Sequence, residues 1–177
     1  MFDWQPTLTG PTVDLRPLVP GDWPALYAVA ADPLLWAQHP MSNRHEEPVF
    51  RNFFAEALAS GGAMIVIERR SGAVIGSSRY YQPDPAAPEV EIGWSFLARS
   101  HWGGTTNREV KRLLLDHAFG LVDQVCFRVG EHNLRSRRAM EKIGGTLSAR
   151  ESFTTGSGGT SVRHVVYEIR KESRPYS

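Results

Sequence analysis

A strand, a glycine-containing turn, a helix and a second strand follow one another in the middle of this chain, and this order constrains its fold more than any other feature. Residues 89–97 read as a strand, and residues 100–107 form a turn that contains Gly103 and Gly104. An amphipathic helix follows, and residues 124–129 read as the second strand. Because a strand–helix–strand unit joins parallel strands by a right-handed crossover, we expect such a crossover inside a mixed sheet.

The start of this helix carries a second pattern. Residues 106–109 have the spacing of a capping box, so we expect the Thr106 hydroxyl and the Glu109 carboxylate to bind free backbone amides. A helix start attracts anions, and glycine lets a ligand approach the backbone closely. Many such turns bind no phosphate, so this pattern alone leaves anion binding open. Apolar spacing predicts a core-facing stripe at Val110, Leu113, Leu114, His117, Ala118 and Leu121.

Further strands and helices surround this central unit. We predict strands over residues 13–18, 63–68, 74–81, 147–153 and 161–169, and helices over residues 22–31, 46–59 and 133–143. Residues 83–88 and 154–160 read as loops. The 177 residues suit one domain with a sizeable core. We therefore expect a single domain over residues 1–177, of the mixed α/β class, in which about four helices flank a twisted mixed sheet of about seven strands.

Composition excludes several classes of function. The 20 basic and 19 acidic residues leave a formal charge of +1, so the basic excess of a phosphate-contacting nucleic-acid binder is absent. No apolar run approaches the length of a membrane span, and the N-terminus does not read as a signal peptide. Cys126 is the single cysteine, and the six histidines show no metal-ligand spacing. We expect a cytoplasmic protein without a metal, a membrane partner or a nucleic-acid partner.

Two motifs in this frame resemble the GNAT N-acetyltransferase superfamily, and its RimJ/RimL branch most of all. The first is the Val-Glu-Ile-Gly-Trp-Ser-Phe-Leu strand of residues 90–97, followed by His-Trp-Gly-Gly at residues 101–104. The second is Asn-Leu-Arg-Ser at residues 133–136, continued by Ala-Met-Glu-Lys-Ile-Gly at residues 139–144. The family's pyrophosphate loop begins with Arg or Gln and ends with Gly or Ala, whereas this chain has Ser100 and Thr105 at those positions. The resemblance implies the GNAT fold and acetyl-CoA as the cosubstrate.

The resemblance also implies which residues bind this cosubstrate. The pantetheine arm would pair with the end of the strand near Phe96, Leu97 and Ala98. The pyrophosphate would rest on the amides of Trp102, Gly103, Gly104, Thr105, Thr106 and Asn107. Asn133 would hydrogen-bond the pantetheine arm, and Ser136 would lie close to the thioester sulfur.

Transfer to an amine needs a proton acceptor for the amine and a proton donor for the departing thiolate. We assign Ser136 as the donor and Glu91, a carboxylate on the reactive strand, as the candidate base. The alternatives are that Ser136 is an ordinary first-turn residue and that Glu91 faces solvent or pairs with an arginine. Trp36, His39 and Arg44 lie where related enzymes bind the acceptor, although Trp36 could instead cover the core.

The leading function is therefore direct transfer of an acetyl group from acetyl-CoA to a primary amine, on a protein N-terminus or on a small molecule. Two rivals remain: a non-catalytic acyl-CoA-binding sensor or regulator, and a nucleotide-phosphate binder that uses the same turn. The lack of a G-x-x-x-x-G-K-[ST] run weakens the second rival. The identity of the acceptor, and the choice between monomer and homodimer, are not readable from the residues.

Overall fold

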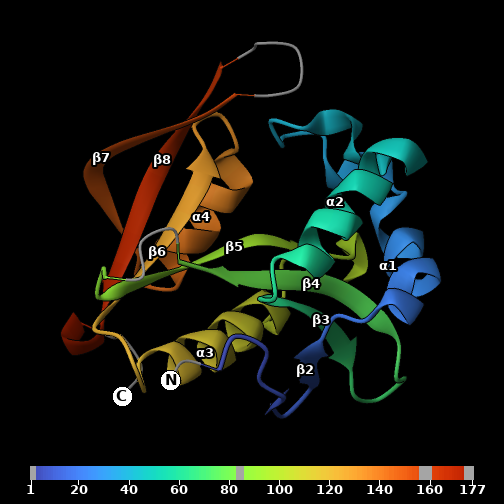
Figure 1. Cartoon of the computed structure of the whole chain (residues 1–177), viewed down its shortest axis with the longest axis horizontal. Helices are drawn as coiled ribbons and strands as arrows, with labels where there is room; N and C mark the ends of the chain where they lie inside the picture. The colour runs from blue at the N-terminus through green and yellow to red at the C-terminus, as the bar shows by residue number, and fades with distance from the viewer. Residues whose placement is uncertain (1–2, 83–85, 156–160, 174–177) are drawn as a thin grey trace.

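The computed structural model describes residues 3–82, 86–155 and 161–173. One eight-stranded sheet has the order β1-β2-β3-β4-β5-β6-β8-β7. Its strands are β1 (Leu8–Thr9), β2 (Val13–Pro17), β3 (Ala63–Glu68), β4 (Val74–Tyr81), β5 (Glu89–Leu97), β6 (Gln124–Gly130), β7 (Thr146–Thr155) and β8 (Ser161–Arg170). The helices are α1 (Trp23–Ala30), α2 (Glu47–Ala59), α3 (Thr106–Ala118) and α4 (Leu134–Lys142), shown in Figure 1.

The expected mixed α/β architecture is confirmed, and β3, β4 and β5 have the predicted bounds. The sheet has eight strands rather than about seven, because the two-residue β1 pairs with β2 at the edge. The pairing of β5 with β6 is parallel, which confirms the predicted crossover, and the other neighbouring pairs are antiparallel. Parts of the two predicted loops, residues 83–85 and 156–160, lie outside the described residues.

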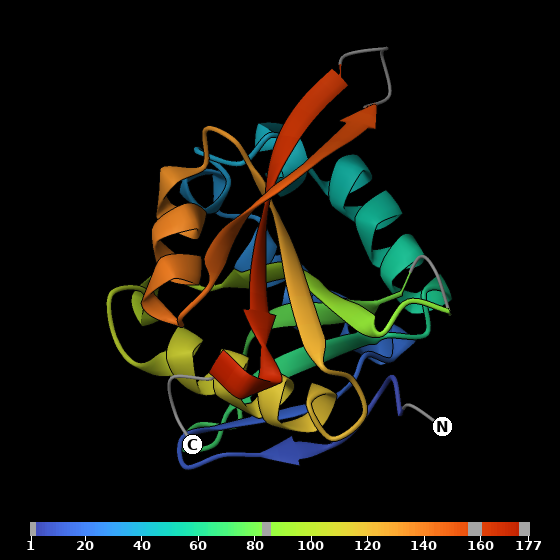
Figure 2. The same cartoon turned by 90° about the vertical axis from the view of Figure 1, so that its left-hand side faces the viewer.

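Helices cover both faces of the sheet, and each pair of helices encloses its own core (Figures 1 and 2). Helices α3 and α4 pack on one face and α1 and α2 on the other. Alternate residues of β3 enter the two cores: Met64 and Val66 face α3, whereas Ala63 and Ile65 face α1 and α2. Two covered faces explain why the sequence of β3 is a continuous apolar run rather than an alternating one.

A bulge in β5 changes the direction of its side chains. The register of β4 and β5 shifts between Ser77 and Arg79, and Trp94 has a φ of 50°, in the left-handed region. Val90 and Ile92 face α3, but Trp94 and Phe96 pack with the core under α1 and α2. In a regular strand Trp94 would share the face of Val90 and Ile92. The bulge inserts one extra residue and so turns Trp94 to the other face.

Strands β5 and β6 pair over a short stretch and then separate. Their parallel register joins Glu89 to Gln124, Val90 to Val125 and Glu91 to Cys126. Both strands continue beyond these pairs, β5 to Leu97 and β6 to Gly130, and Figure 2 shows them running apart. On its side toward β6, the backbone of β5 after the bulge therefore faces an opening in the sheet instead of a paired strand.

Candidate active site

A cleft of about 990 Å³ occupies the opening between β5 and β6. Its walls come from β5, β6, the turn before α3, the start of α4 and the segment between α1 and α2. On its far side β6 stays paired with β8 along its whole length, from Gln124 to Gly130. The cleft therefore combines free β5 backbone with a helix start, two features that suit a ligand with an extended arm and an anionic end.

The turn before α3 forms one end of the cleft. Gly103, Gly104, Thr105 and Asn107 line it, and Gly103 has a φ of 74°, which favours glycine. The predicted capping box is wrong: α3 begins at Thr106 after Thr105, and no side chain caps it. Tertiary contact decides the outcome. The Glu109 carboxylate accepts hydrogen bonds from the backbone amide of Thr12, just before β2, at 2.7 Å and from that of Val13, the first residue of β2, at 3.1 Å. The first-turn amides of α3 therefore have no side-chain cap competing for them.

The start of α4 forms the opposite wall. The Asn133 side chain accepts a hydrogen bond from the Ser136 amide at 3.2 Å, which confirms the predicted cap. Asn133 is buried, and both residues line the cleft. Within the described residues, the Ser136 hydroxyl makes no hydrogen bond to the protein, so it is available to a ligand in the cleft.

Most of the residues predicted to bind the cosubstrate line this cleft. Phe96, Leu97 and Trp102 do so, and the Trp102 indole donates to the Leu97 carbonyl at 2.9 Å. Ala98 and Thr106 are not among the lining residues. The Ala98 amide donates to the Ile75 carbonyl at 2.7 Å, so this amide is already used within the sheet.

The three predicted acceptor residues also meet at the cleft. Trp36 is buried, and its indole donates to the Ala30 carbonyl at 2.7 Å, so it covers the core and lines the cleft at once. The Arg44 guanidinium stacks on the Trp36 ring, with 5.2 Å from its Cζ to the ring centroid. Burial, with Arg44 nearby, lowers the pKa of His39 to about 3, so this imidazole is neutral at physiological pH.

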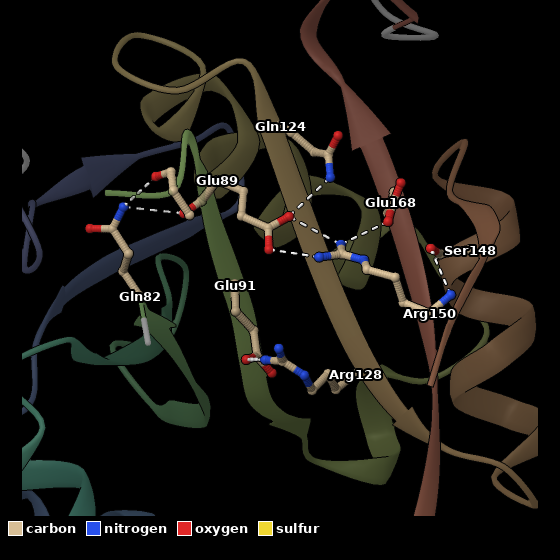
Figure 3. A network of polar contacts seen from close by, with 9 residues as sticks. Gln82, Glu89, Glu91, Gln124, Arg128, Ser148, Arg150 and Glu168 are labelled. Carbon is tan, nitrogen blue, oxygen red and sulfur yellow. Dashed lines mark hydrogen bonds and ion pairs between the residues drawn. The ribbon is translucent and has the colours of Figure 1, made fainter. Parts of the chain in front are cut away.

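Glu91 lies deep in the sheet and is paired. It points away from the core that contains Val90 and Ile92, toward the face of α1 and α2. Figure 3 shows its carboxylate meeting the Arg128 guanidinium of β6, and Arg128 lines the cleft whereas Glu91 does not. Burial raises the pKa of Glu91, and the charge of Arg128 opposes this rise. Glu91 thus pairs with an arginine, as one of the two alternatives for this residue predicts. Its role as the base in proton transfer stays a prediction.

Lys111 is a buried residue of the cleft that the apolar pattern of α3 does not identify. It is 2% exposed, it lines the cleft, and its Nζ donates to the Ser95 hydroxyl at 2.6 Å. Burial lowers its pKa to about 7. The sequence does hold one signal for it, because Lys111 interrupts the apolar spacing of Val110 and Leu114 on the buried side of the helix.

The Lys and Arg side chains that line the cleft give it a positive charge. Within the part of the chain that the structure describes, no Asp or Glu lines it, although Glu91 and Glu68 contact lining residues from behind. Seven Lys and Arg residues line it, namely Arg44, Arg108, Lys111, Arg128, Arg135, Arg138 and Lys142. The charge excess that is missing from the whole chain is therefore present locally, in a cleft suited to an anionic ligand.

The matched family model decides the classification. Residues 12–146 match the model described as "Acetyltransferase (GNAT) domain". The chain belongs to the GNAT acetyltransferase family. GNAT enzymes in general transfer an acyl group from coenzyme A to an amine, and the matched region contains the turn, α3 and α4 that form the cleft.

Solved structures share the GNAT fold of this chain. A GCN5-related N-acetyltransferase from Brucella melitensis superposes with a TM-score of 0.79 at 19% identity, covering 96% of this chain and 80% of the other. Mycobacterium smegmatis RimJ, solved with CoA-disulfide, gives 0.75 at 19% identity, with 100% and 93% covered. Spermidine N-acetyltransferase from Vibrio cholerae, solved with CoA and spermine, gives 0.67 at 13% identity, with 93% and 98% covered.

No curated protein sequence matches the chain. In residues 3–82, 86–155 and 161–173, no helix is long and apolar enough to cross a membrane. The same residues contain no group of three or more His, Cys, Asp or Glu side chains placed to hold a metal ion. Cys126 is buried, and this burial raises the pKa of its thiol to about 12.

Proposed function

We propose that this chain is a single-domain acetyl-CoA-dependent N-acetyltransferase that transfers the acetyl group directly to a primary amine. The observation that carries the proposal is the opening between β5 and β6, which leads to the uncapped start of α3. Free strand backbone suits the amides of a pantetheine arm, and a helix start suits its pyrophosphate. Membership of the GNAT family supports the same assignment.

The basic residues near α3 and α4 suit the remaining phosphate of the cosubstrate. Arg108 lies in the first turn of α3, and Arg138 and Lys142 lie on α4, all at the cleft. The Arg135 guanidinium stacks on Trp102, 3.8 Å from the ring centroid. The amides from Trp102 to Asn107 remain the proposed pyrophosphate contacts, with Gly103 and Gly104 allowing close approach.

Ser136 and Glu91 divide the proton transfers in the proposed reaction. The amine nitrogen attacks the thioester carbonyl, the carbon–sulfur bond breaks, and the amine loses one proton. Ser136, whose hydroxyl faces the cleft, is the proposed donor to the leaving thiolate. Glu91 is buried behind Arg128, and burial raises its pKa. It is the proposed acceptor of the amine proton, which would reach it through a water molecule.

Calorimetry with coenzyme A and a thiol-release assay with acetyl-CoA and a panel of amines and peptides test this proposal. We expect binding and release, and mass spectrometry should find a product heavier by one acetyl group. Binding without release on any acceptor would favour the non-catalytic acyl-CoA sensor. Absence of coenzyme A binding would refute both functions, and competition by ATP alone would favour the nucleotide-phosphate binder.

A Ser136→Ala variant tests the proposed donor. Loss of a general acid lowers turnover by about 100-fold or more, whereas the affinity for coenzyme A should change little. Ser60→Ala is the matched control, because Ser60 is an exposed residue just after α2 and does not line the cleft. An unchanged rate in Ser136→Ala would remove this residue from the mechanism.

A further inference from the structure

Two arginine side chains share one aromatic ring at the acceptor side of the cleft. Arg44 lies just before α2 and Arg79 lies on β4, and both guanidinium groups stack on Phe53 of α2. Their Cζ atoms are 4.7 and 5.6 Å from the centre of this ring. Two groups of like charge therefore contact one apolar side chain, and an anion beside either group would offset their mutual repulsion.

Neither guanidinium has a carboxylate partner within ion-pair distance in the described part of the chain. Arg79 is 6% exposed, and its Nε and Nη2 atoms are buried without a hydrogen-bond partner. The Nη1 atom of Arg44 lies 3.3 Å from Nε2 of the neutral His39. Glu56, an exposed residue of α2, acts on both arginines at longer range.

Two buried carboxylates of this fold are paired, whereas these two guanidinium groups and the Lys111 ammonium have no carboxylate partner in the described residues. Glu91 has Arg128, and Asp22 binds Arg16 at 2.7 Å. A buried charge without a partner costs several kcal/mol in a protein, so unpaired guanidinium groups are rare outside ligand sites. Burial lowers the pKa of Arg44 to about 10 with Arg79 contributing, and this agrees with two cations held close together.

Arg44 lines the acceptor side of the cleft, whereas Arg79 is not a lining residue and lies behind the cleft wall. Arg44 stacks on Trp36, and the Trp36 ring lies 5.1 Å from that of Phe96 on β5. Arg79 stacks on Trp94 of the β5 bulge at 4.6 Å. Trp36, Arg44, Trp94 and Phe96 all line the cleft. The phosphates of the proposed cosubstrate are assigned to the turn before α3 and to α4, so they do not account for this pair.

We infer that the acceptor amine carries an anionic group of the carboxylate class, which binds Arg44 in the cleft while the amine nitrogen faces the thioester. The buried Arg79 adds positive charge behind this site. This inference rests on the proposed function and names the substrate class of the same site. The planar guanidinium offers two parallel donors that match the two oxygens of a carboxylate. Polyamines, such as the spermine bound in the Vibrio cholerae enzyme, have the opposite charge and would be disfavoured here.

Matched acid and amide ligands test the inference without requiring turnover. Calorimetry on the protein saturated with coenzyme A would compare each ω-amino acid, from β-alanine to aminohexanoate, with its primary amide. Dipeptides with Asp or Asn, and with Glu or Gln, at the second position extend the panel. We expect at least one acid to bind about tenfold or more tightly than its amide, as charge-assisted hydrogen bonds imply. Equal or weaker binding of every acid would overturn the inference.

The variants Arg44→Met and Arg79→Met should each reduce the preference for acid over amide toward unity. Coenzyme A affinity and the unfolding midpoint report whether each variant is folded. Arg70→Met is the matched control, because Arg70 is exposed in the turn between β3 and β4 and lies outside the cleft. A retained preference in both arginine variants would also overturn the inference.

The thiol-release assay then separates this inference from the proposed function. Faster release with acids than with amides supports both. Faster release with amides overturns the inference and leaves the transferase assignment standing. Selective binding of acids without release on any amine supports the anion site while contradicting the proposed enzyme.

Discussion

Replacing Lys111 with methionine should stabilise this protein, and the size of the effect follows from the burial of its ammonium group. Lys111 is 2% exposed. Its Nζ donates one hydrogen bond, 2.6 Å to the Ser95 hydroxyl, and lies 5.3 Å from the centre of the Phe127 ring. Burial lowers its pKa from 10.5 to about 7. This shift means that burying the protonated ammonium group costs the folded state about 5 kcal/mol. Methionine has a similar length and carries no charge, so it removes this cost.

The pH dependence gives the prediction its sign. Between the two pKa values the unfolded chain binds the proton and the folded chain releases it, so the wild-type stability rises with pH over this window. The cost of Lys111 is about 5 kcal/mol near pH 6 and about 2 kcal/mol near pH 9. The variant also loses one hydrogen bond, which is worth about 1 kcal/mol. Lys111→Met should therefore raise the free energy of unfolding by about 4 kcal/mol near pH 6 and by about 1 kcal/mol near pH 9.

Urea unfolding of the wild type and the variant at both pH values measures these gains directly. Lys171→Met is the control, since Lys171 is exposed and its substitution should change the free energy of unfolding little at either pH. A gain that is the same near pH 6 and near pH 9, or a destabilised Lys111→Met, would refute the reasoning. Either result would mean that water or a rearrangement solvates the ammonium group in the folded state.

Three further predictions address the sheet around the cleft. Gly76→Ala should lower the free energy of unfolding by about 1–3 kcal/mol in a urea titration, because the new Cβ would lie 2.1 Å from the Phe96 carbonyl oxygen of β5. Tyr80→Phe should cost about 1 kcal/mol in the same assay, since the buried Tyr80 hydroxyl donates to the Leu114 carbonyl at 2.6 Å; an unchanged stability would contradict this bond. Arg128→Met should shift the acidic limb of the rate–pH profile to higher pH, because it removes the cation that lowers the pKa of Glu91. Glu91→Gln should abolish that limb. An acidic limb unaltered in both variants would show that another group accepts the proton.

Local patterns predicted the elements of this fold well. Strands β3, β4 and β5 begin and end where the apolar runs and the turn residues place them, and Asn133 caps α4 as its residue type predicts. These features depend on neighbours within a few residues, which the sequence displays directly. The parallel crossover is also local in this sense, because the β5–turn–α3–β6 order leaves few other connections.

Long-range contacts account for the expectations that failed. Glu109 belongs to a capping pattern, yet it binds backbone amides at the start of β2, nearly one hundred residues away in the chain. Trp94 changes face because β4 and β5 shift register at the bulge. No window of sequence around either residue contains the partner that decides its position.

By itself, the sequence determined the class of the fold, the order of its elements and the position of the glycine-containing turn before α3, because spacing and turn residues act locally. The tertiary structure alone decided that Arg44 and Arg79 meet on Phe53, that Glu91 pairs with Arg128 and that Lys111 lies in the wall of the cleft. The charge of the whole chain is nearly balanced, and folding separates it so that the cleft is lined by cations. Electrostatic interactions act through space and depend on burial, so a separation of this kind becomes visible when distant segments are brought together.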